Sequence, residues 1–128
     1  MPKQIIHTDH APAAVGPYSQ GVISGNLLFT AGQVALDPAT GKLVEGDIQA
    51  QTEQVMKNLQ AVLTAAGTSF DNVVKATVFL ANISDFGAMN AVYGRYLPHN
   101  PPARSAFQVG ALPLGALVEI EMVAIVGD

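Results

Sequence analysis

The sequence predicts an α+β fold in which two helices cover one face of a mixed sheet of about six strands. Short runs of β-branched residues recur along the chain, two longer segments have one apolar side at helical spacing, and no linker or repeat divides the 128 residues. A helix with a single apolar side packs well on a sheet. We therefore expect one domain over residues 1–128, with the element order β-β-β-α-β-α-β-β.

Two short strands are expected at residues 20–24 and 27–33, because both runs are apolar and a tight-turn pair, Gly25-Asn26, separates them. Glycine and asparagine adopt the positive φ angles that two-residue hairpin turns require. A second turn, at residues 37–42, is predicted to lead into a third short strand near Leu43 and Val44.

The first helix is expected to begin after Asp47, a favourable N-cap, and to end before Gly67, a favourable residue just beyond a helix. At 100° per residue a set of mostly apolar side chains falls on one stripe: Ile48, Thr52, Val55, Leu59, Val62, Leu63 and Ala66. This stripe is predicted to face the sheet.

The β-branched run at residues 73–80 predicts the next strand, and Ser84 is expected to cap a second helix that runs to about Leu97. Asn90 falls on the apolar side of this helix, so we expect its amide to be buried and hydrogen-bonded. Pro98 ends the helix, and a strand at residues 103–109 follows.

The last strand, at residues 117–126, alternates apolar residues on both of its sides. Because the predicted helices cover only one face of the sheet, a strand that is apolar on both sides favours self-association.

Charged residues are also scarce in the chain. Only 16 of the 128 residues carry charge (6 Lys and Arg, 10 Asp and Glu), where a typical soluble domain would have roughly 32. Such a surface is either adhesive or hidden against copies of the same chain.

Several classes of function are disfavoured. The net charge is −4 and the six cations are scattered, so no nucleic-acid partner is expected. The absence of a long apolar run predicts no membrane partner and no signal peptide, and hence a cytoplasmic protein. No cysteine is present, which excludes disulfides, thiol catalysis and cysteine-based zinc sites. The histidines, His7, His10 and His99, lack the spacing of a metal site, and we expect none.

The C-terminal third contains a sparse pair of charges. No charged residue lies between Arg104 and Glu119, and Glu121 shares one side of the last strand with Glu119. Arg104 is expected in an interior strand, where a charge needs a partner. The pair is either an ion pair that holds the sheet together or a site. In a site, the arginine would bind a planar anion and the glutamate would move protons. The residues alone leave both interpretations open.

Two further positions attract attention. Tyr18 lies in a rigid turn at residues 16–20, and Gly32 follows an apolar strand. A glycine there permits a ligand or another chain to approach the backbone closely. By itself, a tyrosine in such a turn more often has a structural role than a role in a site.

Taken together, several segments resemble the RidA (YjgF) family. They are Ala11–Gly21, Thr30-Ala31-Gly32-Gln33, the turn at Asp37-Pro38, Ala65-Ala66-Gly67, Lys75–Phe79, Asp85–Asn90, Pro102–Phe107, Gly110, Leu112 and Val118-Glu119-Ile120. These segments span nearly the whole chain.

The resemblance implies a chorismate-mutase-like α+β fold and a homotrimer with ligand clefts between subunits. It implies an enamine/imine deaminase that hydrolyses 2-aminoacrylate and related species to 2-keto acids and ammonia, a 2-iminobutanoate/2-iminopropanoate deaminase. It also implies that no cofactor is needed, and that the substrates come from pyridoxal-phosphate-dependent dehydratases.

By the same resemblance, Arg104 binds the substrate carboxylate and Glu119 positions and activates water. Tyr18, Gly32 and Asn90 correspond to further residues of the ligand cleft.

Two substrate-cleft positions depart from the common pattern. Ala31 stands where a serine is common, and Ala106 where a cysteine is common. Ala106 retains the backbone groups that a substrate or water would contact. The chain therefore lacks any thiol-dependent reactivity.

Two other functions stay open. The same cleft could bind small 2-keto or amino acids without catalysis, with the trimer acting as a sensor, scaffold or holdase. Cleavage of RNA is the third alternative, and the acidic balance of the chain argues against it.

Overall fold

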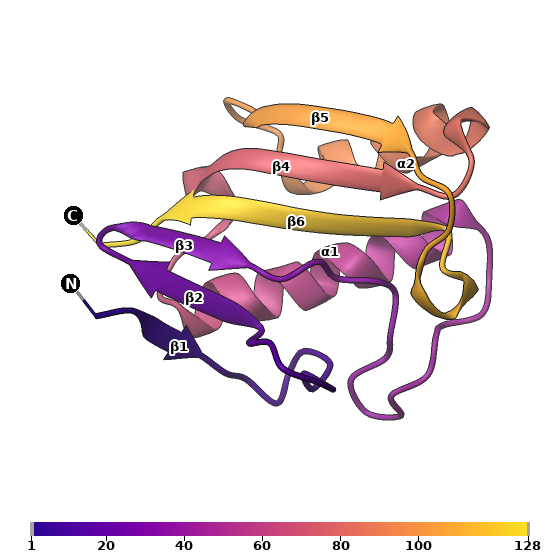
Figure 1. Cartoon of the computed structure of the whole chain (residues 1–128). Coiled ribbons are helices and arrows are strands. Elements are labelled where there is room, and N and C mark those ends of the chain that lie inside the picture. Colours follow the sequence, from indigo (N-terminus) through magenta and orange to yellow (C-terminus); the bar gives the residue numbers. More distant parts are fainter. Residues whose placement is uncertain (1, 128) are drawn as a thin grey trace.

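A six-stranded mixed sheet with both helices on one of its faces forms the structure, a computed structural model that describes residues 2–127 (Figure 1). The strand order is β1-β2-β3-β6-β4-β5. The strands are β1 (Gln4–Ile6), β2 (Gly21–Ser24), β3 (Leu27–Thr30), β4 (Val73–Leu80), β5 (Ala103–Gln108) and β6 (Val118–Ile125). Only β4 and β5 pair in parallel, because helix α2 connects them. The predicted α+β class and the helical layer are confirmed.

Helix α1 (Ile48–Ala65) has the ends that the sequence predicts. The Asp47 carboxylate accepts a hydrogen bond from the Ala50 amide (3.0 Å), so it satisfies a donor that the first turn leaves open. At the other end, Gly67 has φ +80° and the Thr68 amide donates to the Leu63 carbonyl (3.0 Å). This closure is favourable because glycine adopts the left-handed conformation without strain.

Helix α2 (Phe86–Tyr96) begins differently from the prediction. A 3-10 turn, Ile83–Asp85, precedes it, and the N-cap position is Asp85 rather than Ser84. The Asn82 side chain accepts the Ser84 amide (2.9 Å), so an Asx turn uses the backbone that the serine cap would have needed. Within residues 2–127, neither helix has the length and apolarity needed to cross a membrane.

The N-terminal strands also differ from the expectation. The third predicted strand, near Leu43 and Val44, is only an isolated bridge between Leu36 and Leu43. The sixth strand is instead β1, which pairs Ile5 with Val22 at the edge of the sheet. A strand of three residues has too short a pattern to be recognised in the sequence, since its stability comes from its neighbour.

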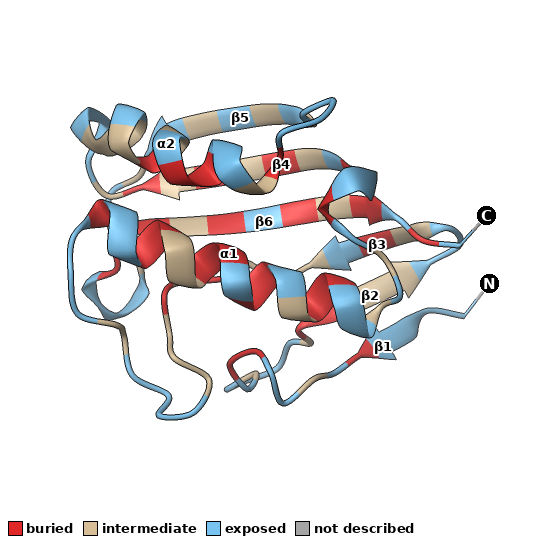
Figure 2. Ribbon diagram, turned by 180° about the vertical axis from the view of Figure 1, so that it is seen from behind, coloured by how far each residue is buried: buried red, intermediate tan, exposed pale blue. Residues whose placement is uncertain are grey.

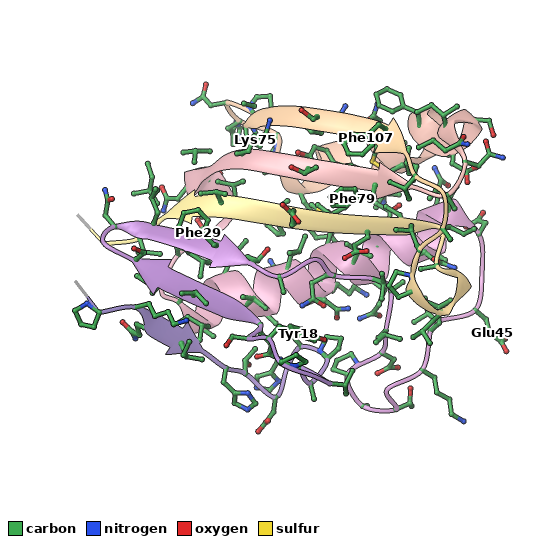
Figure 3. All side chains as sticks on the ribbon, viewed as in Figure 1. Tyr18, Phe29, Glu45, Lys75, Phe79 and Phe107 are labelled. Carbon is green, nitrogen blue, oxygen red and sulfur yellow. The ribbon has the colours of Figure 1, made fainter. Side chains whose placement is uncertain are left out.

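The two faces of the sheet are very unequal. Leu28, Val78 and Ile120 point to the helices and are fully buried, and Figure 2 shows buried positions, in red, along α1 and the central strands of the sheet. On the other face, Phe29 and Phe107 are each 45% exposed, and Figure 3 shows them with Phe79 and Lys75 on the face of the sheet that no helix covers.

One placement was wrong. Arg104 lies on β5, which is an edge strand and not an interior one. The reason is the strand order, which a pattern of residues does not specify.

Candidate functional site

A bulge at the end of β3 brings the chain against β6. Phe29 pairs with Val123, and Gln33 bridges to Ile120, so four residue steps on one side match three on the other. At the bulge, the Thr30 hydroxyl oxygen accepts a hydrogen bond from the Met122 amide (3.0 Å), in place of a main-chain partner. Bulges of this kind re-aim side chains and are common next to functional sites.

Gly32 lies in this bulge, directly against the Glu119 carboxylate. A Cβ atom at position 32 would overlap the Glu119 Oε2 atom. The close approach that the sequence suggested for this glycine is therefore made to a carboxylate, and any other residue would displace that carboxylate.

Glu119 faces a cleft of about 530 Å³ on the side of the sheet without helices. The cleft is lined by Val15, Tyr18, Ala31, Gly32, Val34, Leu36, Pro113, Leu114 and Glu119. Glu119 is the one charged residue in this lining. The structure thus brings four sequence-predicted site residues together here: Tyr18, Ala31, Gly32 and Glu119.

The environment of Glu119 favours proton uptake. Burial raises the pKa of its carboxyl above the usual range, and the negative charge of Glu121, two residues along the same side of β6, raises it further. A carboxylate with raised basicity is suited to accept a proton from water and to return it to a substrate.

Tyr18 presents a hydroxyl to the same cleft. Its oxygen accepts a weak hydrogen bond from the Val15 amide (3.4 Å), and the side chain is 51% exposed (Figure 3). This bond uses a lone pair of the oxygen, so the hydroxyl proton is available for donation to a ligand.

The loop that carries Tyr18 is held by the buried amide of Gln20. The Gln20 Oε1 atom accepts the Thr8 amide (2.7 Å), and Nε2 donates to the Pro12 carbonyl (2.8 Å). The Gln20 carbonyl accepts the Ala31 amide (2.9 Å), which fixes the bulge to the same point. A buried amide with all of these partners is strongly anchored.

Two more buried amides, from α1, hold the other walls of the cleft. Asn58 donates through Nδ2 to the carbonyls of Val34 (3.2 Å) and Leu36 (2.9 Å). Gln51 accepts the Leu117 amide (2.9 Å) at the end of the loop that contains Leu114. Each amide contacts main-chain atoms, so each wall has a fixed backbone.

Arg104 lies in a different cluster, next to α2. Its Nη1 atom donates to Asn90 Oδ1 (2.6 Å), which confirms the hydrogen bond expected for Asn90. Asn90 is half-buried, however, and not buried as predicted. The guanidinium carbon lies 5.3 Å from the centroid of Phe86 and 4.8 Å from that of Tyr93. These contacts hold the planar cation in one orientation.

Tyr93 was missed as a site neighbour, because it falls on the apolar stripe of α2, where a tyrosine ordinarily serves the core. Its hydroxyl is the one buried side-chain polar atom without a hydrogen-bond partner in residues 2–127. Burial raises the pKa of the Tyr93 hydroxyl, and the positive charge of Arg104 acts in the opposite direction.

The two clusters lie on opposite faces of the sheet. Arg104 is paired with the fully buried Ala76, on the side of the helices, whereas Glu119 is paired with Phe79 on the other side. Ala106, two residues beyond Arg104, shares its face. Arg104 and Glu119 therefore form no ion pair within one chain, and the only one in residues 2–127 joins exposed His7 and Asp9.

His7 and His10 are exposed in the N-terminal segment, and His99 is exposed after α2. In the described range, no three histidine, aspartate or glutamate side chains gather as a metal site would require.

The fold and sequence are similar to those of several known proteins. The chain is 51% identical to protein DfrA of Myxococcus xanthus over 98% of its own length and 97% of that protein. It is 49% identical to the 2-iminobutanoate/2-iminopropanoate deaminase of Mus musculus, covering 98% of this chain and 93% of the relative. The crystal structure of YyfA from Yersinia pestis, a protein of the conserved Rid family, superposes with a TM-score of 0.94 at 48% identity, over 98% of this chain and 100% of that one.

The model of the family described as "Endoribonuclease L-PSP" matches residues 8–126, which include both clusters. Relatives named as imine deaminases and as Rid proteins cover nearly the whole chain at about half identity. The chain therefore belongs to the Endoribonuclease L-PSP family, also called the YjgF/RidA family.

Proposed function

We propose that this protein hydrolyses 2-imino acids of the 2-iminobutanoate and 2-iminopropanoate class, and their enamine forms such as 2-aminoacrylate, to 2-keto acids and ammonia. The relatives that carry the deaminase name support this reaction class. The observation that carries it in this chain is Glu119, a carboxylate of raised pKa held against Gly32 in a mostly apolar cleft.

Glu119 is proposed to act as a proton carrier in two steps. It accepts a proton from water while the water oxygen bonds to the C=N carbon, and it passes that proton to the nitrogen, which gives a carbinolamine. It then transfers the hydroxyl proton to the same nitrogen, the C–N bond breaks, and the C=O bond forms as ammonia leaves. A positioned acid–base group of this kind typically contributes ~10²–10⁴-fold in rate.

The substrate carboxylate is proposed to bind to Arg104 of a neighbouring subunit in a homotrimer. Three observations support this assignment: Arg104 and Glu119 occupy opposite faces of one chain, one face of the sheet is uncovered, and charge is scarce on the surface. Asn90 orients the guanidinium for a two-point grip of the carboxylate. Fixing the carboxylate places the C=N carbon next to one water.

Ala31 and Ala106 are proposed to contribute backbone groups only. Both are half-buried, and neither supplies a hydroxyl or a thiol. No cofactor takes part in the proposed reaction. We place it in the cytoplasm, downstream of pyridoxal-phosphate-dependent dehydratases, which release the enamines.

The test is a coupled assay in which a serine or threonine dehydratase generates the imine and keto-acid release is followed. Arg104→Lys should lose most of the activity, because an ammonium cannot reproduce a two-point grip. The exposed Arg95→Lys is the matched control and should retain activity. Turnover near the wild-type rate in Arg104→Lys would refute the role of Arg104.

The role of Glu119 is tested separately. Glu119→Gln should still bind a 2-keto acid, measured by calorimetry, but should hydrolyse imines ~10²-fold or more slowly. The exposed Glu45→Gln is the control. An unchanged rate in Glu119→Gln removes this residue from the mechanism.

A non-catalytic binding trimer or holdase is the second candidate, because the cleft would bind a 2-keto or amino acid equally well. It predicts tight binding without any acceleration of keto-acid release. RNA cleavage, suggested by the family description, is disfavoured by the net charge of −4. Salt-sensitive RNA binding by the pure protein would favour it instead.

A further inference from the structure

Leu114 occupies a backbone conformation that suits glycine rather than leucine. It has φ 60° and ψ 19°, and Gly115 follows with φ 71°. The Gly115 amide donates to the Leu112 carbonyl (3.3 Å) and the Ala116 amide to that of Pro113 (3.0 Å), so Leu114 is central in two overlapping tight turns. Glycine and asparagine are the residues that such positions favour, and a leucine there costs free energy.

The same side chain is also exposed. Leu114 is 69% and Val15 79% exposed, more than the other exposed large hydrophobic side chains of the described residues. They come from separate segments, the loop between β5 and β6 and the loop before β2, yet both line the cleft. Figure 1 shows the β5–β6 loop, orange to yellow, descending beside the start of β6. Strain and exposure together indicate that Leu114 has an apolar contact to make at this point.

The other residues that line the cleft indicate which kind of group would contact Leu114 and Val15. Val34 and Leu36 line the same cleft, and Glu119 is its one charged residue. A substrate with a methyl side chain would fill only a small part of about 530 Å³. An anionic substrate side chain would lose its hydration against these walls and would meet a charge of the same sign on Glu119.

We propose that Leu114 and Val15 form a subsite for the substrate side chain, and that it selects 2-imino acids with branched or long aliphatic side chains. This inference rests on the proposed function, since Glu119 locates the reacting carbon. A hydrophobic pocket discriminates by roughly 10–200-fold for each added methylene. Leu114 and Val15 thus act as specificity-determining residues, distinct from the acid–base and carboxylate-binding groups.

The experiment compares kcat/KM for imines made from alanine, leucine and glutamate by an amino-acid oxidase. The wild-type protein should prefer the leucine-derived imine to the other two. Leu114→Asn keeps a residue that tolerates the left-handed turn but removes the apolar contact. It should lower the ratio of kcat/KM for the leucine-derived imine to that for the alanine-derived imine about tenfold relative to wild type. Ile83→Asn is the matched control, because Ile83 is 49% exposed and does not line the cleft.

Light scattering on the same samples distinguishes substrate contact from subunit contact. If Leu114→Asn lowers activity on all three imines equally, or dissociates the oligomer, Leu114 packs against another subunit and the subsite is refuted. If the wild-type protein turns over none of the imines, the proposed function fails by itself. The subsite is then judged by the affinities for pyruvate and for the 2-keto acid of leucine. An affinity ratio that Leu114→Asn leaves unchanged would overturn it.

Discussion

Arg104 and Glu119 point away from each other, to opposite faces of the sheet. The backbone partner of Arg104 is Ala76, buried beneath the helices, and that of Glu119 is Phe79, on the uncovered face. A single chain therefore presents two separate clusters, one around a cation and one around a carboxylate of raised pKa. Oligomerisation by rotation about a symmetry axis is a direct way to bring such unlike patches together.

This geometry predicts complementation between two inactive variants. In an oligomer assembled from equal amounts of Arg104→Lys and Glu119→Gln chains, about a quarter of the sites combine an intact Arg104 with an intact Glu119, since each has a chance of one half. We therefore expect co-expressed variants to regain about a quarter of wild-type activity. If both residues acted within one chain, no mixed oligomer would contain an intact site and activity would stay at the level of the single variants.

Glu121→Gln should shift the acid limb of the activity profile to lower pH. Glu119 must be ionised to accept a proton from water, and the negative charge of Glu121 raises the pKa of Glu119. Removing that charge lowers the pKa, so the base form persists to lower pH. The shift is measured in kcat/KM against pH, and it should shrink at high salt. Glu45→Gln, whose side chain points away from the sheet in Figure 3, should leave the acid limb in place.

Gly32→Ala should reduce activity about 10²-fold, because the added methyl group overlaps the Glu119 carboxylate and moves it from its position. The fold should persist, since the Glu119 side chain borders the open cleft and has room to rotate. Gly110→Ala is the control, because nothing lies within 4 Å of the Cβ position there. Wild-type kcat/KM in Gly32→Ala would show that the location of the carboxylate is not critical.

We expect the raised pKa of Tyr96 to make the folded protein less stable at alkaline pH. Burial, and then Glu53 beside it, raise the pKa of Tyr96 from 10.0 to about 12. Between these values the unfolded chain has released a proton that the folded chain retains. The contribution of Tyr96 to the free energy of unfolding is therefore complete below pH 10 and is lost as pH rises toward 12. In Tyr96→Phe, urea denaturation should show a smaller fall in stability across this window. An identical fall would assign the alkaline transition to other groups, because Tyr93 is present in both proteins.

The sequence predicted well what short-range periodicity determines. The stripe of α1, its Asp47 cap and the strand Val73–Leu80 are all confirmed. The sequence-based prediction failed for strands whose formation depends on a neighbouring strand in space. β1 exists because β2 lies beside it, and Leu43 makes only an isolated bridge.

The candidate site shows the same division. The chemical character of Arg104 and Glu119 stands out because the C-terminal third is almost empty of charge. Their placement on opposite faces depends on the registers of β4 with β5 and with β6, which are long-range pairings. The bulge before Gln33 shifts the register of this segment against β6 by one residue, and no local sequence pattern predicts it.

The three buried amides have a consequence for how this cleft can change over evolutionary time. These amides form hydrogen bonds with main-chain atoms of the cleft walls and not with the side chains that the walls carry; the residues are Gln20, Gln51 and Asn58. The wall side chains are therefore free to vary while the backbone that displays them stays fixed. A family built on this scaffold can exchange residues such as Leu114 or Val34 and change what the cleft binds, with the Glu119 carboxylate left in place.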